Sequence, residues 1–140
     1  MTSPRSVAFV FARLAVGLGF LSAVADRFGL WGPPDATNVA WGNFDSFLQY
    51  TAKLNPYLAS ALVPALGWAV TIAEIVVGLL LVAGLYVRHA AAAGFVLLCG
   101  FALGMAIGTG IKTAFDASVP AAAAAALLLW LWPAEDHTRA

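Results

Sequence analysis

The chain has 140 residues, of which 62% are hydrophobic and 10% are charged, and its seven acidic and seven basic residues leave no net charge. Soluble domains carry about 25% charged residues, so the composition excludes a soluble globule with a polar shell around one core. The chain has no run of Lys or Arg, which excludes a typical nucleic-acid-binding protein. The mean hydropathy of +0.89 instead predicts one compact membrane domain over residues 1–140.

Four long apolar segments follow one another along the chain. Each approaches the roughly 20 residues that cross a bilayer as a helix, and none alternates between polar and apolar residues as a barrel strand does. The predicted crossings are residues 6–25, 62–86, 90–108 and 117–132. Because a segment in lipid must satisfy its backbone hydrogen bonds internally, we expect an all-α fold, an integral membrane four-helix bundle.

A long connection, residues 26–61, separates the first two crossings. Within it, residues 43–54 place Phe44, Phe47 and Thr51 at helical spacing, which predicts a short amphipathic helix at the membrane interface. Two interpretations of this helix remain open. It either covers the bundle as a structural element, or it provides a docking surface for a partner or a gate over a lipid-accessible pocket.

The later connections are short. Residues 87–89 alone separate the second and third crossings and predict a tight antiparallel hairpin, in which Arg88 is a topology anchor. Residues 109–116 join the last two crossings, and Asp116 is expected to cap the last helix. An even number of crossings places both termini on the same side of the membrane.

The basic residues indicate which side faces the cytoplasm. The side of the termini has Arg5, Arg88 and Arg139, with Arg13 nearer to it, and the other side has Arg27, Lys53 and Lys112. Cytoplasmic loops carry the excess of positive charge in membrane proteins. We therefore expect both termini in the cytoplasm.

Two charges of opposite sign interrupt the apolar crossings: Arg13 lies in the first, and Glu74 lies near the middle of the second. A charge at bilayer depth costs roughly 3 kcal/mol on insertion scales, so it persists only when it is paired, hydrated or protonated. Counted from the side of the termini, Arg13 lies about 10 Å deep and Glu74 about 18 Å deep. We predict that the two form an intramembrane polar pair, either a structural ion pair or a polar site for a ligand, a proton or a quinone headgroup.

Other polar residues give weaker indications. Asp26 and Arg27 end the first helix and are expected to form an interfacial pair. His89 and His137 lie at or beyond helix ends and do not suit a buried bis-histidine haem site, and no His and carboxylate set has metal-ligand spacing. We predict no metal site and no cofactor-binding motif, and the sequence assigns no catalytic residue.

Glycine recurs at four-residue spacing in the third crossing. Gly100, Gly104 and Gly108 give one smooth helix face, which lets a neighbouring helix approach closely. The expected partner of this face is either the alanine-rich last crossing, at residues 121–126, or a second copy of the chain.

The first two crossings resemble those of the DoxX family. In the first, an arginine, a glycine four residues later, a phenylalanine and a basic residue recur in the family's order, here as Arg13, Gly17, Phe20 and Arg27. In the second, the family's glutamate, two glycines and closing arginine correspond to Glu74, Gly78, Gly84 and Arg88. We expect the glycines among these residues to serve helix packing.

The resemblance extends over three crossings, and the fourth agrees only in length and hydrophobicity. Two departures occur: Ala23 and Val24 stand where relatives often carry a small polar or histidine-glycine pair, and Val77 stands beside Gly78 where relatives have a second glycine. The resemblance implies a multi-pass protein of a bacterial-type inner membrane with redox associations, such as membrane subunits of thiosulfate:quinone oxidoreductase. It also implies that Arg13 and Glu74 are the family's intramembrane polar pair.

These observations lead to one main hypothesis and two alternatives. The main hypothesis is a membrane subunit of a redox or respiratory assembly, which anchors a membrane or soluble redox partner and contributes to a quinone-accessible or lipid-accessible pocket. Aliphatic side chains do not carry electrons, so catalysis by the chain alone is not expected. The alternatives are a small oligomeric, proton-coupled carrier that uses Glu74 and a purely structural accessory subunit.

Overall fold

The computed structural model describes residues 3–133, and every regular element within that range is helical. The elements in chain order are α1 (Pro4–Arg27), α2 (Phe44–Leu54), the 3₁₀ turn η1 (Ser60–Leu62), α3 (Val63–Ala83), α4 (Val87–Gly108), α5 (Ile111–Asp116) and α6 (Val119–Leu131). This confirms the all-α prediction for the described part of the chain. Arg139 and His137, which entered the charge and haem arguments, lie outside the described residues.

Three helical segments are long and apolar enough to cross a membrane, namely Pro4–Arg27, Ser60–Ala83 and Val87–Gly108. The remaining apolar helix, Val119–Leu131, has 13 residues, which span about 20 Å of a hydrocarbon core that is about 30 Å thick. By length and composition, the structure therefore provides three membrane spans and one shorter apolar helix.

The predicted last crossing, residues 117–132, is interrupted near its start. Ser118 adopts a left-handed backbone with φ 57°, and Pro120 follows in the first turn of α6, where a proline is tolerated because its missing N–H has no helical partner. The preceding residues form α5 instead of a loop. Asp116 consequently does not cap α6; it ends α5 and pairs with Lys112 one turn earlier.

The other boundaries differ from the predictions by a few residues. α1 starts earlier than residue 6, because the Ser3 hydroxyl accepts a hydrogen bond from the Ser6 N–H at 3.2 Å and caps the helix. α3 ends at Ala83 because Gly84 turns left-handed, with φ 74°, a conformation that glycine adopts without steric cost. The hairpin turn is therefore residues 84–86 rather than 87–89, and Arg88 lies exposed in the first turn of α4.

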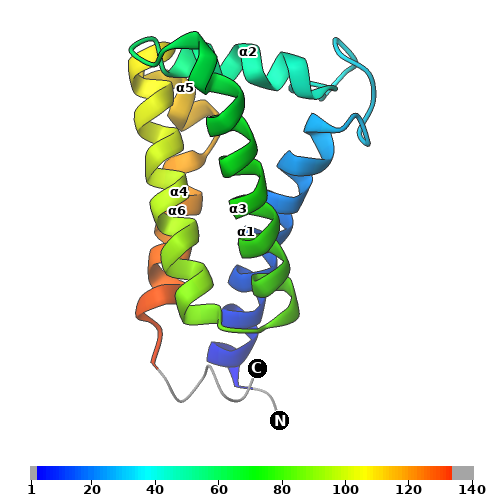
Figure 1. Cartoon of the computed structure of the whole chain (residues 1–140). Coiled ribbons are helices and arrows are strands. Elements are labelled where there is room, and N and C mark those ends of the chain that lie inside the picture. Colours follow the sequence, from blue (N-terminus) through cyan, green and yellow to red (C-terminus); the bar gives the residue numbers. More distant parts are fainter. Residues whose placement is uncertain (1–2, 134–140) are drawn as a thin grey trace.

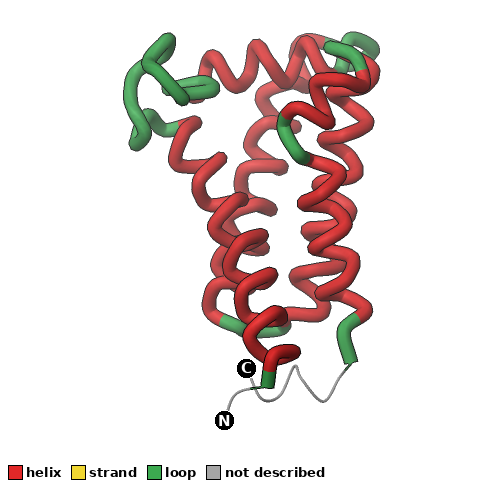
Figure 2. The backbone as a smooth tube through the Cα atoms, turned by 180° about the vertical axis from the view of Figure 1, so that it is seen from behind, coloured by secondary structure: helices red, strands yellow, loops and turns green. Residues whose placement is uncertain are grey.

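The long helices run side by side, and α2 lies across one end of them (Figure 1). α1 packs along α3, α4 packs along α6, and the tight hairpin joins α3 to α4. Figure 2 shows the same arrangement from behind, with the long loop after α1 projecting at the end where α2 lies. At the opposite end, the rings of Phe9 in α1 and Trp132 after α6 lie 5.7 Å apart.

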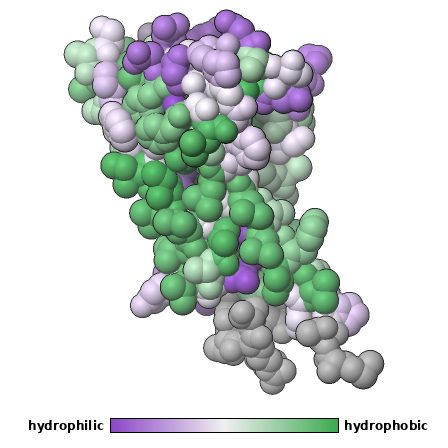
Figure 3. All heavy atoms as spheres, turned by 90° about the vertical axis from the view of Figure 1, so that its right-hand side faces the viewer, coloured by the Kyte–Doolittle hydropathy of each residue, from purple (hydrophilic) through white to green (hydrophobic). Residues whose placement is uncertain are grey.

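Apolar side chains fill the interior and also cover much of the outside. The core includes Phe9, Phe20, Leu81, Ala91, Ala126 and Leu129. Phe11, Val96 and Leu103 are large apolar residues that point outward, with 74%, 66% and 62% of their surface exposed. On the face drawn in Figure 3, hydrophilic residues gather at the end with α2, and the middle is largely hydrophobic. Such an extensive apolar exterior is unlike that of soluble monomers.

Candidate functional site

A cavity of about 610 Å³ lies between α1, α3, α4 and α6, next to α2. Its volume falls within the range of small-molecule sites, about 300–1,000 Å³. Most of its lining is apolar, including Phe20, Leu54 and Phe101. The charged side chains of Arg27 and Glu74 line it as well, so this space combines an apolar wall with a small polar region.

Small residues on facing helices create the space. On α1, Ala15, Gly19 and Ala23 recur every four residues along the wall, and on α4 the wall includes Gly100. A Cβ atom built on Gly19 or Gly100 would meet no other atom within 4 Å. The cavity therefore exists because side chains are missing at these positions, and larger side chains there would fill it.

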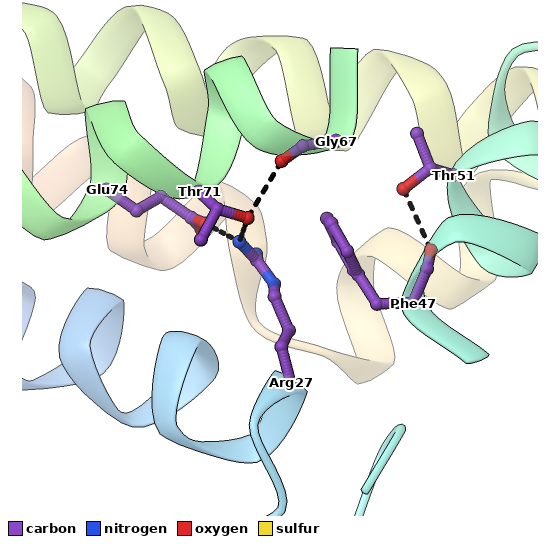
Figure 4. Close-up of polar contacts among 6 residues, drawn as sticks. All are labelled: Arg27, Phe47, Thr51, Gly67, Thr71 and Glu74. Atoms are coloured by element: carbon purple, nitrogen blue, oxygen red, sulfur yellow. Dashed lines mark hydrogen bonds and ion pairs between the residues drawn. The ribbon is translucent and has the colours of Figure 1, made fainter. Parts of the chain in front are cut away.

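The polar region is built by one arginine and two residues of α3. Arg27, at the last position of α1, forms an ion pair with Glu74 through Nη1 and Oε2. The same Nη1 donates a hydrogen bond of 2.8 Å to the Thr71 hydroxyl, which itself donates to the Gly67 carbonyl at 2.8 Å. Figure 4 shows Arg27 reaching from α1 to both side chains on α3. Arg27 and Glu74 are 2% and 1% exposed, so the pair is shielded from solvent.

Aromatic rings complete the surroundings of the guanidinium. Its Cζ atom lies 3.8 Å from the centre of the Phe47 ring in α2 and 5.3 Å from that of Trp41. Such cation-π contacts contribute about 0.5–2 kcal/mol each, depending on desolvation. One donor remains unused: Nε of Arg27 is buried and has no hydrogen-bond partner among the described residues.

Asp26 holds the loop that carries Trp41. Its carboxylate accepts hydrogen bonds from the backbone N–H groups of Ala40, Trp41 and Gly42 at 2.8–3.0 Å. The predicted interfacial pair of Asp26 with Arg27 is therefore wrong. Neighbouring positions on a helix point about 100° apart, so Asp26 turns to the loop while Arg27 turns to α3.

A second polar group of the lining comes from α2. Tyr50 lines the cavity, and burial raises the pKa of its phenol above the ordinary value of 10.0. The nearby Thr109 side chain has a smaller, opposite effect on this pKa. The phenol is consequently protonated at neutral pH and available as a hydrogen-bond donor on the cavity wall.

The predicted pair of Arg13 and Glu74 does not form. Glu74 takes Arg27 as its partner, and the described residues contain no ion pair with Arg13. The contacts between α1 and α3 explain why. Gly17 lies against Leu81, and Arg27 lies against Thr71. The position on α1 that is level with Glu74 is therefore about one turn from Arg27 but about three turns, or roughly 16 Å, from Arg13.

The sequence contained a signal for this register. Gly17 and Gly78 face each other, and a Cβ on either glycine would lie 3.1 Å from the carbonyl oxygen of the other. Small residues that allow such a close approach are typical of crossing points between membrane helices. If Gly17 and Gly78 are placed at the same level, Glu74 lies nearer to Arg27 than to Arg13. Thr71 then also lies close to Arg27.

Arg13 occupies a different place. It is 7% exposed, and its guanidinium lies where a Cβ atom of Gly84 would be. This position is beside the turn between α3 and α4. Gly84 thus serves both the left-handed turn and the Arg13 side chain, whereas Arg88, the remaining polar candidate, is exposed.

The glycine face of α4 has an unexpected partner. A Cβ on Gly104 would contact Leu54, and a Cβ on Gly108 would collide with the backbone of Lys53 and Leu54. The face predicted to pack against residues 121–126 or a second copy therefore meets the last turn of α2, and Gly100 faces open space. The four-residue spacing indicated close approach correctly but not which segment approaches.

Within residues 3–133, no group of three His, Cys, Asp or Glu side chains is placed to hold a metal ion. Comparison of the chain with family models, curated proteins and solved structures gives no match. The cavity and its polar region are therefore the features of the molecule that bear on its function.

Proposed function

We propose that this chain is a DoxX-like four-helix membrane protein that binds a quinone, or a molecule of similar shape and polarity, as a membrane subunit of a redox assembly. In this proposal α1, α3 and α4 cross a bacterial-type inner membrane, α5 and α6 together complete the fourth crossing, and α2 lies at the interface. Support for insertion comes from the three long apolar helices and the apolar exterior.

The cavity between the helices is the observation that carries this proposal. A quinone combines an apolar ring and tail with carbonyl oxygens, which accept hydrogen bonds. The cavity offers an apolar wall that Arg27 and Tyr50 also line, and the phenol of Tyr50 is protonated. The phenol of Tyr50 matches a carbonyl oxygen of the ring as a donor, while the remaining wall accommodates the apolar part.

The chain contributes binding and orientation, and redox partners contribute electron transfer. The Glu74 carboxylate neutralises the Arg27 charge, and Thr71 fixes the guanidinium through Nη1. The polar region of the cavity therefore carries little net charge, which suits a neutral ligand better than an anion. Because the same ion pair occupies Glu74, the geometry favours a binding site over a carrier that needs a free titratable carboxylate.

The test is binding of ubiquinone-1 to the purified protein in mild detergent, measured by equilibrium dialysis. We compare the wild type with Gly100→Leu, which places a side chain in the open space, and with Ala124→Leu, an exposed position on α6 away from the cavity lining. We expect Gly100→Leu to weaken binding at least tenfold, or about 1.4 kcal/mol, and Ala124→Leu to leave it unchanged.

Equal affinities of the wild type and Gly100→Leu would refute the cavity as the binding site. Failure of the wild type to bind ubiquinone-1 more than the micelles alone would refute a quinone site. Flux of protons into proteoliposomes that Glu74→Gln abolishes would instead support the carrier alternative.

A further inference from the structure

Arg13 is a buried cation whose charge the described part of the chain leaves without a counterion. The side chain is 7% exposed, and its Nε and Nη1 atoms have no hydrogen-bond partner within residues 3–133. The described acidic residues either have other partners or lie far from Arg13. Glu74 pairs with Arg27, Asp116 pairs with Lys112, and Asp26 accepts hydrogen bonds from a loop backbone. Asp35 and Asp45 are exposed in or next to that loop. A buried charge in this state is strongly unfavourable, so an anion from outside the described residues is expected.

The level of Arg13 in the fold identifies where that anion comes from. Its guanidinium lies against Gly84, at the end of α3 and beside the turn into α4. The apolar helix α3 ends here and α4 begins here, so the headgroups of a surrounding bilayer would lie at the level of this turn. Leu85 and Tyr86, which form the rest of the turn, are 55% and 75% exposed.

Other cations gather at this end of the molecule. Arg5 is exposed at the start of α1, and Arg88 is exposed at the start of α4. In contrast, the described carboxylates lie near the middle of α3 or toward the end with α2 (Figure 1). The end with the α3–α4 turn is therefore electropositive over the residues that the structure describes, which attracts anionic headgroups.

We propose that Arg13 binds the phosphate of an anionic phospholipid at the α3–α4 turn. A guanidinium donates two parallel hydrogen bonds to a phosphate, and these bonds are stronger where water is excluded. Gly84 provides the room for the guanidinium to reach the turn. This inference rests on the membrane insertion in the proposed function but not on the binding of a quinone.

The experiment measures the lipids bound to the protein by native mass spectrometry, after titration in mild detergent with phosphatidylglycerol or phosphatidylcholine. For the wild type, we expect at least tenfold tighter binding of phosphatidylglycerol. Arg13→Gln should abolish this preference, and Arg13→Lys should retain part of it, because an ammonium keeps the charge but not the planar donors. Lys112→Gln, which removes an exposed cation at the opposite end, should keep the full preference.

Further measurements distinguish a lipid site from a site for free anions and from pairing with the chain's own carboxylates. Inorganic phosphate that displaces phosphatidylglycerol completely at equal concentration would indicate a free-anion site and overturn the lipid proposal. A wild type without preference, which gains one after Glu135→Gln and Asp136→Asn, would assign the counterion to the chain's own carboxylates. Two outcomes would still refute the proposal if Arg13→Gln does not fold. One is equal binding of both lipids by the wild type. The other is a preference that stays undiminished in Arg13→Lys but is lost in Lys112→Gln.

The two proposals fail separately. Loss of the lipid preference with ubiquinone-1 binding intact would reject only the role of Arg13. Loss of ubiquinone-1 binding with the lipid preference intact would reject only the quinone site. A chain that alkaline carbonate extracts from membranes would reject the insertion on which both depend.

Discussion

Arg27 is the residue on which the polar region depends. It joins the end of α1 to the middle of α3 through Glu74 and Thr71, and it contacts α2 through the Phe47 ring. A buried ion pair is weak evidence for stability, because desolvation of both charges offsets their attraction. Removing only one partner is different, since it leaves the other charge buried and unpaired.

We therefore predict that Arg27→Gln lowers the free energy of unfolding by about 3–5 kcal/mol. The measurement is the thermal unfolding midpoint in mild detergent, followed by circular dichroism. Arg88→Gln is the matched control, because this arginine is exposed and its loss should change stability by no more than about 0.5 kcal/mol. The double variant Arg27→Leu with Glu74→Leu should recover most of the loss; equal effects of Arg27→Gln and Arg88→Gln would contradict the structural role of the pair.

At the scale of elements, α2 is held in place at both of its ends. At its start, the Phe44 ring lies 4.4 Å from the Trp68 ring of α3. At its end, Leu54 packs against the glycine face of α4. Because Phe47, Tyr50 and Leu54 also line the cavity, the position of α2 determines the shape of the candidate site.

This arrangement predicts opposite outcomes for two alanine substitutions on one helix. A Cβ on Gly108 would lie 2.6 Å from Leu54 Cα, whereas a Cβ on Gly100 would meet nothing within 4 Å. Gly108→Ala should cost about 1–3 kcal/mol through overpacking, and Gly100→Ala should leave the unfolding midpoint unchanged or slightly higher. Both variants are measured in the same detergent and by the same method. A midpoint for Gly108→Ala as high as that for Gly100→Ala would show that α2 does not press on α4.

For the whole molecule, the arrangement of helices specifies which segments share a side of the membrane. The start of α1, the turn of residues 84–86 and the end of α6 lie at one end, and the loop after α1, α2 and the start of α5 lie at the other (Figure 1). Among the described exposed cations, Arg5 and Arg88 belong to the first end and Lys53 and Lys112 to the other, so cytoplasmic termini stay a prediction from the positive-inside rule.

Labelling of single cysteines tests this topology. In a Cys99→Ser background, we expect an impermeant maleimide added to right-side-out vesicles to label Thr37→Cys and Lys112→Cys. Ser3→Cys and Tyr86→Cys should react only after the membrane is opened. Labelling of Lys112→Cys and Ser3→Cys from the same side would contradict the three crossings of α1, α3 and α4, and the inverse of the whole pattern would contradict cytoplasmic termini.

Composition and hydrophobic continuity alone determined the class of this protein: an all-helical chain with long apolar helices, and an amphipathic helix between the first two. The apolar runs placed the start of the first helix at residue 6 and the end of the second crossing at residue 86, whereas the Ser3 cap and the Gly84 turn set the actual ends, because caps and turns depend on neighbouring residues. The helix break at Ser118 was not predicted, because an apolar run continues through it and hydrophobicity does not indicate a local change of backbone conformation.

Only the tertiary structure decided which charges meet. Glu74 pairs with Arg27 and not with Arg13 because the contact between Gly17 and Gly78 sets the register of α1 against α3. Likewise, Gly104 and Gly108 of α4 face the last turn of α2, whereas Gly100 faces open space. Periodicity fixes which side chains share a helix face, but the sliding and rotation of one helix against another follow from packing across many contacts, which no single segment encodes.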